Sequence, residues 1–332
     1  MRNLVDPFGR TIQYLRLSVT DRCDFRCVYC MPEKMQFLPK KDILDLEELE
    51  KICATFIKLG VKKIRLTGGE PLVRRNIMNL IFYLSSFLKN GQLEEITLTT
   101  NGSQLSFFAK DLFRAGIQRI NVSLDSLNHD KFLSITRKGN LSNVLEGIKL
   151  AQKEGLQIKI NMVALKGIND NEFTNMVSWC IDHKCDLTFI EIMPMGEIDQ
   201  HRIDQYMPLS EVKQIIEKNW ILEPIPYRTG GPARYMKING QDIKLGFITP
   251  LTHNFCENCN RVRVTCTGQL YLCLGQDNSI NLKNIIRNSS DINVLEQEII
   301  KAIKQKPKGH DFIIGDQNTK PSIARHMSMT GG

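Results

Sequence analysis

The sequence predicts an α/β protein built on a parallel sheet, and three observations support this prediction. Residues 12–193 alternate strand-like and helix-like segments, several helical segments end at a glycine, and the pattern changes after about Gly196. Repeated strand–helix units fold into parallel strands with right-handed crossovers. They fit either a doubly wound sheet or an incomplete (β/α) barrel, and in both folds ligands gather at the carboxyl ends of the strands.

Six strand–helix repeats are expected in this part of the chain. Strands are predicted at residues 12–19, 61–66, 95–99, 117–124, 156–164 and 187–193. Helices, marked by apolar residues at helical spacing, are predicted at 46–59, 77–88, 141–154 and 171–181, with another ending at Ala115. Gly60, Gly116 and Gly155 directly follow helical segments, where glycine is the usual C-cap.

The remaining residues differ in composition and organisation. Residues 197–235 are rich in proline and glycine and hold one expected helix near 209–219. Residues 236–247 alternate around Asn239-Gly240, which predicts a hairpin, and 291–304 predict an amphipathic helix. A chain of 332 residues corresponds to about two domains. We therefore expect a partial barrel over residues 1–196 and a C-terminal extension over 197–332.

Composition limits the class of protein. Apolar residues make up 42% of the chain and charged residues 24%, as in folded globular proteins. No apolar run approaches the ~18 residues of a membrane helix, and the N-terminus has no signal-peptide pattern, so we expect a cytoplasmic protein. The net charge is +8, from 44 Lys and Arg against 36 Asp and Glu, but no basic run indicates a nucleic-acid tail.

Cysteine is the most informative residue type. The chain has ten, and in a reducing cytosol they indicate metal ligands, catalytic thiols or small buried residues. Cys23, Cys27 and Cys30 follow the first expected strand at Cys-x3-Cys-x2-Cys spacing. Structural zinc normally takes four ligands, whereas this loop offers three and no nearby histidine. Three thiolates suit a cubane iron–sulfur cluster that keeps one iron open.

A second group of cysteines lies near the other end of the chain. Cys256, Cys259 and Cys273 have Cys-x2-Cys-x13-Cys spacing, which again gives three thiols. Cys266 is a candidate fourth ligand that would close the site for zinc or for a fully coordinated cluster. The alternating segment around Cys266 is equally natural for a buried thiol. We favour a second cluster with its own open iron.

Basic residues point to an anionic substrate. Arg261 and Arg263 lie two residues apart, so on a strand they face the same side, and arginine matches phosphate oxygens well. Arg16, Arg65 and Lys159 lie within or at the ends of expected strands. Charges in apolar strands are costly unless they are paired or ligand-bound. One polyanionic substrate would explain all three residues together, and ordinary Asp or Glu partners would explain them separately.

Two further polar features lie at expected strand ends. Gly68-Gly69 precedes Glu70-Pro71 directly after the second strand, and only glycine lets a backbone approach a ligand very closely. An ordinary turn is the alternative for this segment. Ser123 ends the fourth strand, where polar residues often bind ligands, although a helix N-cap is also compatible.

The first cysteine loop, with Tyr29 before its last cysteine, resembles the signature of the radical S-adenosylmethionine superfamily. In that superfamily the open iron binds the amino and carboxylate groups of S-adenosylmethionine, whose reductive cleavage gives a 5′-deoxyadenosyl radical. The segment from Thr67 to Pro71 is similar to the superfamily motif whose backbone meets the amino group of that cofactor.

Residues 15–32, residues 255–274 and the terminal Gly331-Gly332 together resemble the GTP 3′,8-cyclase family of molybdenum cofactor biosynthesis. The resemblance covers essentially the whole chain. It implies an incomplete (β/α)6 TIM-like barrel with a C-terminal α+β extension that carries a second iron–sulfur cluster. It also implies two [4Fe-4S] clusters, S-adenosylmethionine as cofactor, and conversion of GTP to (8S)-3′,8-cyclo-7,8-dihydroguanosine 5′-triphosphate.

The resemblance also implies roles for single residues. The expected cluster ligands are Cys23, Cys27, Cys30, Cys256, Cys259 and Cys273. The expected S-adenosylmethionine contacts are Tyr29, Gly69, Ser123 and Met193. The expected GTP contacts are Arg16, Arg65, Thr99, Lys159, Arg261, Val262 and Arg263, with Thr100 as the alternative to Thr99. The expected catalytic residues are Arg261, Arg263, Gly331 and Gly332, on a tail in which Thr330 stands where we expect an apolar residue.

Partners follow from the same resemblance. GTP is the expected substrate, an electron donor must supply the cluster, and a cyclic pyranopterin monophosphate synthase is the expected downstream pathway partner. We expect neither membrane nor nucleic acid as a partner, and a homodimer is compatible with the sequence. One alternative is another radical enzyme with an auxiliary cluster that acts on a peptide or tRNA. A zinc-binding nucleic-acid module is the alternative of a different class, and it requires closed four-ligand sites and a basic stripe.

Overall fold

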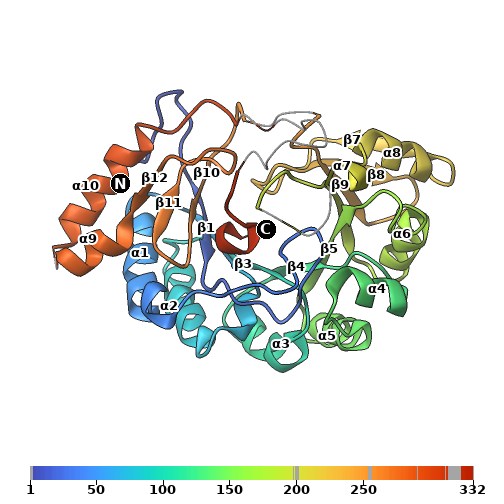
Figure 1. Cartoon of the computed structure of the whole chain (residues 1–332), viewed down its shortest axis with the longest axis horizontal. Helices are drawn as coiled ribbons and strands as arrows, with labels where there is room; N and C mark the ends of the chain where they lie inside the picture. The colour runs from blue at the N-terminus through green and yellow to red at the C-terminus, as the bar shows by residue number, and fades with distance from the viewer. Residues whose placement is uncertain are drawn as a thin grey trace.

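A computed structural model describes residues 3–196, 198, 202–252, 256–289, 291–310, 312 and 323–331. Its described strands form one twelve-stranded sheet in the order β12-β11-β10-β1-β2-β3-β4-β5-β6-β9-β8-β7. The sheet curves around a centre in which the C-terminal segment lies, and helices cover its outer side (Figure 1).

Six parallel strands form the middle of the sheet. They are β1 Tyr14–Ser18, β2 Lys63–Thr67, β3 Glu95–Thr100, β4 Arg119–Ser123, β5 Gln157–Ala164 and β6 Asp186–Glu191. Each strand pairs in parallel with the next one in the chain. A doubly wound sheet reverses its strand order at a switch point, whereas this order runs without reversal. The structure therefore confirms the incomplete TIM-like barrel.

Helices connect these strands along the outside of the sheet (Figure 1). They are α1 Leu46–Lys58, α2 Ile77–Lys89, α3 Leu105–Arg114, α4 His129–Thr136, α5 Leu141–Lys153 and α6 Phe173–Asp182, with short 3-10 turns η1 Lys40–Asp42 and η2 Pro71–Val73. Asp45 begins α1 with a capping box, since its side chain accepts from Glu48 N and Glu48 reaches back to Asp45 N. The expected helices are confirmed, and α4 is an additional short helix that the sequence analysis did not predict.

Both ends of the barrel sheet are extended by segments from the C-terminal part of the chain. At one end β10 Arg261–Val264 pairs in parallel with β1, followed by the antiparallel strands β11 Gln269–Tyr271 and β12 Ser279–Asn281. At the other end β9 Lys244–Ile248 pairs with β6, followed by β8 Arg234–Ile238 and β7 Leu222–Ile225. The antiparallel pair of β8 and β9 confirms the hairpin expected around Asn239-Gly240.

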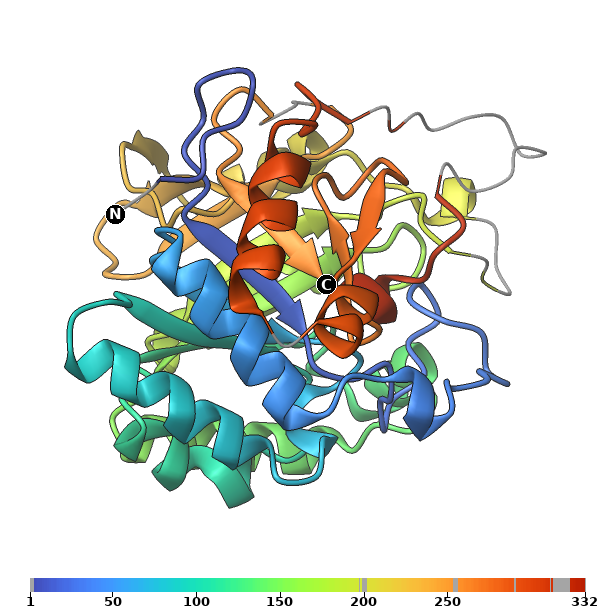
Figure 2. The ribbon, with the colours of Figure 1, turned by 90° about the vertical axis from the view of Figure 1, so that its left-hand side faces the viewer.

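The remaining helices are α7 Arg202–Gln205, α8 Leu209–Glu217, α9 Leu282–Asn288, α10 Ile292–Ile303 and α11 Met327–Thr330. Helices α9 and α10 pack beside α1 on the same side of the molecule (Figure 2). Helix α11 contacts β1 inside the curve of the strands. No described helix is long and apolar enough to cross a membrane. The boundary at residue 196 stays a prediction, because the sheet runs through both parts of the chain.

Candidate active site

The first cysteine loop directly follows β1 and is held against α4. Arg26 N donates to Thr136 O at 2.9 Å, and Val28 N donates to Ile135 O at 2.9 Å. These backbone bonds flank Cys27 and fix the middle of the loop. The three loop cysteines, Cys23, Cys27 and Cys30, all line one cavity at the carboxyl ends of the strands.

The cavity around this loop contains the other residues expected to meet S-adenosylmethionine. Its wall includes Tyr29, Gly69, Ser123 and Met193. These residues come from the cysteine loop and from positions at or just after the ends of β2, β4 and β6, so the fold brings together four separate stretches of sequence. Both Thr99 and Thr100 reach this cavity.

Glycine is required at positions 68 and 69 for close backbone packing, a reason that the sequence analysis did not identify. A Cβ added at Gly68 would overlap Thr20 O, and one added at Gly69 would overlap Arg22 O. Gly69 N donates to Thr20 O at 2.8 Å, so the two backbones lie in direct contact. The glycines therefore let the turn after β2 pack against the start of the cysteine loop, in addition to lining the cavity.

Glu70 anchors the same turn. Its carboxylate accepts from Leu72 N at 2.9 Å, from Thr100 Oγ1 at 2.9 Å and from Asn101 N at 2.6 Å. The side chain is fully buried, and this burial raises the pKa of Glu70 to about 7. The Thr100 hydroxyl therefore donates to Glu70, whereas the Thr99 hydroxyl accepts from Arg65 Nη1 at 3.1 Å.

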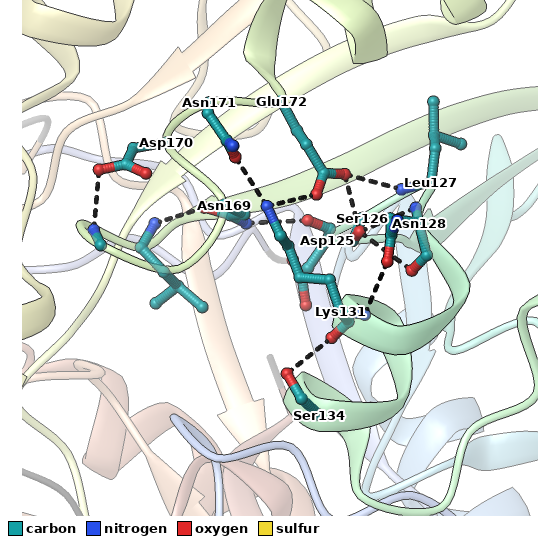
Figure 3. Close-up of polar contacts among 12 residues, drawn as sticks. Asp125, Ser126, Leu127, Asn128, Lys131, Ser134, Asn169, Asp170, Asn171 and Glu172 are labelled. Atoms are coloured by element: carbon teal, nitrogen blue, oxygen red, sulfur yellow. Dashed lines mark hydrogen bonds and ion pairs between the residues drawn. The ribbon is translucent and has the colours of Figure 1, made fainter.

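Asp125 ties Tyr29 to the loops after β4 and β5. Tyr29 Oη donates to Asp125 Oδ2 at 2.7 Å, and Asn169 Nδ2 donates to Asp125 O at 2.8 Å. Burial raises the pKa of Asp125 to about 6. Figure 3 shows the contact between Asn169 and Asp125 beside a second set of polar contacts, in which Glu172 accepts from Ser126 Oγ at 2.7 Å. Asp125 is thus a fixed partner of the Tyr29 hydroxyl that the sequence motif around Tyr29 did not reveal.

A second cavity adjoins the first. Thr99, Asn161, Ile190 and Met193 line both cavities and form their common wall. The second cavity is also lined by the second group of cysteines, Cys256, Cys259 and Cys273, and by the basic residues Arg16, Arg65, Lys159, Arg261 and Arg263. Every basic residue singled out in the sequence therefore faces one space.

Strand register explains how the cations converge. Arg16 pairs with Arg65 across β1 and β2 and with Arg263 across β1 and β10. Residues in register on neighbouring strands point to the same face, so these three side chains form one row. Lys159 faces the cavity from β5. Val262, also expected near the substrate, is buried between Arg261 and Arg263.

Two tyrosines that the sequence analysis missed hold these cations. Tyr14 Oη accepts from Arg65 Nε at 2.5 Å, and Tyr235 Oη accepts from Lys159 Nζ at 2.6 Å. Burial lowers the pKa of Lys159 to about 7, with a further contribution from the positive charge of Arg65. Tyr14 lies two residues before Arg16 on the same strand, so period-two reading would have found it. Tyr235 lies in the hairpin, and no pattern in the sequence marks it.

The donor sets fit groups larger than a single ion. Burial raises the pKa of the Cys23 and Cys27 thiols, with Glu70 and Asp125 adding negative charge, so a cation is needed to hold them as thiolates. In the described part of the chain, no three His, Cys, Asp or Glu side chains converge closely enough for one metal ion. A cubane takes its thiolates at separate corners and does not require such convergence.

The second cysteine group has a different electrostatic setting. Burial alone would raise the pKa of Cys259. The positive charges of Arg261 and Lys306 have the larger effect, and the pKa is lowered to about 7. Cys266 lies elsewhere, beside Ser18 and Asp21, and its carbonyl accepts from Leu44 N at 2.8 Å. The structure therefore separates Cys266 from the three cysteines that line the second cavity.

The C-terminal tail reaches the row of arginines. Gly331 O accepts from Arg263 Nη1 at 2.7 Å and from Arg16 Nη2 at 3.5 Å. Gly331 has φ +76°, and a Cβ there would overlap Thr67 Oγ1. Thr330, where an apolar residue was expected, is fully buried. Gly332 lies outside the described residues.

Comparison with known proteins assigns the family. A model of the radical SAM superfamily matches residues 17–180, and a model described as Molybdenum Cofactor Synthesis C matches residues 185–312. The GTP 3′,8-cyclase of Brucella ovis is 60% identical over 329 residues, which cover 99% of this chain and 96% of that protein. The GTP 3′,8-cyclase of Brucella abortus is 59% identical over the same length. The chain belongs to the GTP 3′,8-cyclase family.

Solved structures agree with the fold of this GTP 3′,8-cyclase family member. The crystal structure of Streptococcus suis SuiB bound to S-adenosylmethionine has a TM-score of 0.63 at 16% identity, covering 97% of this chain and 78% of that chain. SuiB bound to the precursor peptide SuiA has a TM-score of 0.64 at 15% identity, covering 97% and 77%. Family membership identifies S-adenosylmethionine and iron–sulfur clusters as the cofactors.

Three of the four cysteines outside the two groups lie in the hydrophobic core of this GTP 3′,8-cyclase family member. Cys53, Cys180 and Cys185 are fully buried in the main hydrophobic core. Burial raises the pKa of each thiol, as expected for small apolar-like residues.

Proposed function

We propose that this protein is a radical S-adenosylmethionine cyclase that converts GTP to (8S)-3′,8-cyclo-7,8-dihydroguanosine 5′-triphosphate, an early step of molybdenum cofactor biosynthesis. The observation that carries the proposal is the 60% identity over 329 residues to the GTP 3′,8-cyclase of Brucella ovis. Two adjoining cavities, each lined by three cysteines, support it by offering one place for the cofactor and one for the nucleotide.

In the first cavity, Cys23, Cys27 and Cys30 would hold the first [4Fe-4S] cluster. Tyr29, Gly69, Ser123 and Met193 would line the S-adenosylmethionine site. When bound, the cluster and S-adenosylmethionine together supply a radical that abstracts the ribose 3′ hydrogen of GTP.

In the second cavity, Cys256, Cys259 and Cys273 would hold the second [4Fe-4S] cluster, beside which the guanine would lie. The row formed by Arg16, Arg65 and Arg263, with Lys159 and Arg261, would bind the triphosphate. Thr99 lies in the wall between the cavities and orients Arg65. A nucleotide fixed at both ends has restricted freedom, which favours ring closure between C3′ and C8.

Arg261, Arg263 and the tail glycines would complete the catalytic set. Arg263 already holds Gly331 O at 2.7 Å, so the tail and the guanidinium fix each other's position. This contact supports a role for the tail beside the proposed triphosphate site. Val262, between the two arginines on β10, lines the same cavity and would also contact the nucleotide.

The proposed reaction requires partners that the chain itself does not provide. An electron donor must reduce the first cluster, and a cyclic pyranopterin monophosphate synthase would consume the product. We keep a homodimer and a cytoplasmic location as proposals from the sequence.

The decisive experiment uses anaerobically reconstituted protein with S-adenosylmethionine, dithionite and GTP carrying deuterium at C3′. We expect 5′-deoxyadenosine that contains deuterium, together with a cyclised nucleotide, both detected by mass spectrometry. The matched control is Cys27→Ser, which should give neither product. Unlabelled 5′-deoxyadenosine without a cyclised nucleotide would contradict GTP as the substrate and would favour the peptide or tRNA alternative.

A further inference from the structure

The segment from Lys306 to His310 lies against all three cysteines of the second group. Lys306 Nζ lies 3.9 Å from Cys259 Sγ, and Gly309 O lies 3.9 Å from Cys273 Sγ. The backbone of His310 hydrogen-bonds to Cys256. The sequence analysis did not select any residue of this segment, because none has a recognised motif.

Arg10, from the N-terminal part of the chain, fixes the segment in place. Its Nη1 donates to Cys256 O at 2.7 Å and to Lys308 O at 2.8 Å, and its Nη2 donates to Pro307 O at 2.6 Å. Asp6 in turn accepts from Arg10 Nε. Arg10 therefore holds residues 306–310, called the Lys306 strap below, beside the cysteines.

Lys306 is a buried hydrogen-bond donor. The residue is only 2% exposed. Its Nζ hydrogen-bonds to Leu272 O and to Arg261 O, the latter at 3.1 Å, and the remaining direction is toward Cys259 Sγ. The two carbonyl oxygens are acceptors, and so is the Cys259 sulfur when it is a thiolate ligand; an ammonium group has three N–H donors and no acceptor. The geometry thus matches an ammonium with every hydrogen used.

We propose that Lys306 is a positioning residue that sets the reduction potential of the second cluster. With Cys259 as a cluster ligand, Lys306 donates an N–H···S hydrogen bond to its sulfur and places one positive charge beside it. Reduction adds one electron and so one negative charge to the cluster, which both effects stabilise. Net charge and hydrogen bonds to sulfur are established determinants of cluster potential. This inference rests on the proposed function, because it requires the second cluster.

A purely structural role for Lys306 gives a different expectation. Its bonds to Arg261 O and Leu272 O join the start of β10 to the residue before Cys273. If Lys306 served only this purpose, its loss would loosen the site and reduce iron content. In protein that still bound the second cluster, the reduction potential would be the same whether residue 306 was charged or neutral.

The test is an EPR-monitored redox titration of full-length protein in which Cys23, Cys27 and Cys30 are replaced by serine, so that only the second cluster loads. We expect Lys306→Met to make reduction at least tenfold less favourable, a negative shift of about 59 mV or more for one electron. Lys306→Arg keeps the charge and should lie close to the parent. Lys308→Met removes an exposed charge two residues away and should leave the potential unchanged.

The remaining outcomes of this titration either overturn the proposal for Lys306 or contradict the proposed function. An unchanged potential in Lys306→Met at full iron content would overturn the proposal. If Lys306→Met does not retain iron, Lys306→Gln replaces it in the same comparison. Loss of iron in both variants, with retention in Lys308→Met, would show the structural role and would also overturn the proposal. No iron in the parent with the three serines would contradict the proposed function itself, which is a separate failure.

Discussion

At the scale of single residues, Tyr235 makes a contact whose removal should weaken substrate binding. Its hydroxyl accepts from Lys159 Nζ at 2.6 Å and its ring lies 4.9 Å from the same nitrogen. Tyr235→Phe keeps the ring but removes the acceptor that favours the charged amine. The pKa of Lys159, already lowered to about 7 by burial, should then fall further.

Since a polyanion binds the ammonium form, we expect the Kd for GTP to rise roughly tenfold at neutral pH in Tyr235→Phe, which is ~1.4 kcal/mol. The deficit should shrink as the pH falls below 7, because Lys159 then becomes protonated in both proteins. Equilibrium binding across this pH range measures it. Tyr227→Phe is the control, because Tyr227 packs on Tyr235 edge to face and keeps that ring contact. Equal loss at every pH would contradict the role of Lys159 protonation.

Residue identities were predictable from sequence only where local spacing carries chemistry. The six proposed cluster cysteines and the five cavity cations could be selected because thiols in triplets and charges in apolar strands are unusual. Tyr14 could also have been selected, because it lies two residues before Arg16 on the same strand. Tyr235 and Lys306 escaped selection, since each acts through a partner far away in the sequence. Their roles depend on which strands become neighbours, and one-dimensional spacing does not contain that information.

At the scale of elements, the C-terminal helix α11 docks through Gly331. This residue has φ +76°, and a Cβ there would overlap Thr67 Oγ1 on β2. Gly331→Ala should therefore displace the tail from the arginine row while leaving the barrel folded. We expect cyclised nucleotide formation to fall at least tenfold with little change in Tm, as measured by product assays and thermal unfolding.

Gly230→Ala is the matched control for this prediction. Gly230 also has positive φ, +69°, but no atom lies within 4 Å of the position of an added Cβ. It therefore reports the backbone strain of a left-handed alanine, ~1–2 kcal/mol, without the steric clash. Equal activity losses in the two variants would show that strain, not docking of the tail, is responsible.

The elements themselves were largely predictable, for a physical reason. Amphipathic helices such as α1 and α5 carry strong helical periodicity and begin at side-chain caps on Asp45 and Asn140. The barrel, in contrast, could not be separated from a doubly wound sheet by local pattern. Both folds use the same strand–helix unit, and only the pairing order decides between them.

At the scale of the whole molecule, one continuous sheet joins the two cysteine sites. The first loop follows β1, and the second group flanks β10 and β11, with β10 paired directly to β1. Each site nevertheless has its own loop contacts, since α4 holds the first and the Lys306 strap holds the second. We therefore expect the clusters to load independently while acting on one shared space.

Cys273→Ser tests this expectation. The variant should keep ~4 Fe per chain from the first cluster and should still cleave S-adenosylmethionine to 5′-deoxyadenosine, but it should form no cyclised nucleotide. Cys53→Ser, in the core and away from both cavities, is the control for loss of a buried thiol and should retain ~8 Fe. Iron analysis and product assays measure both outcomes. If Cys273→Ser also lost the first cluster, the two sites would be one cooperative unit, because removing a ligand just after β11 would then have disrupted the loop after β1 through their common sheet.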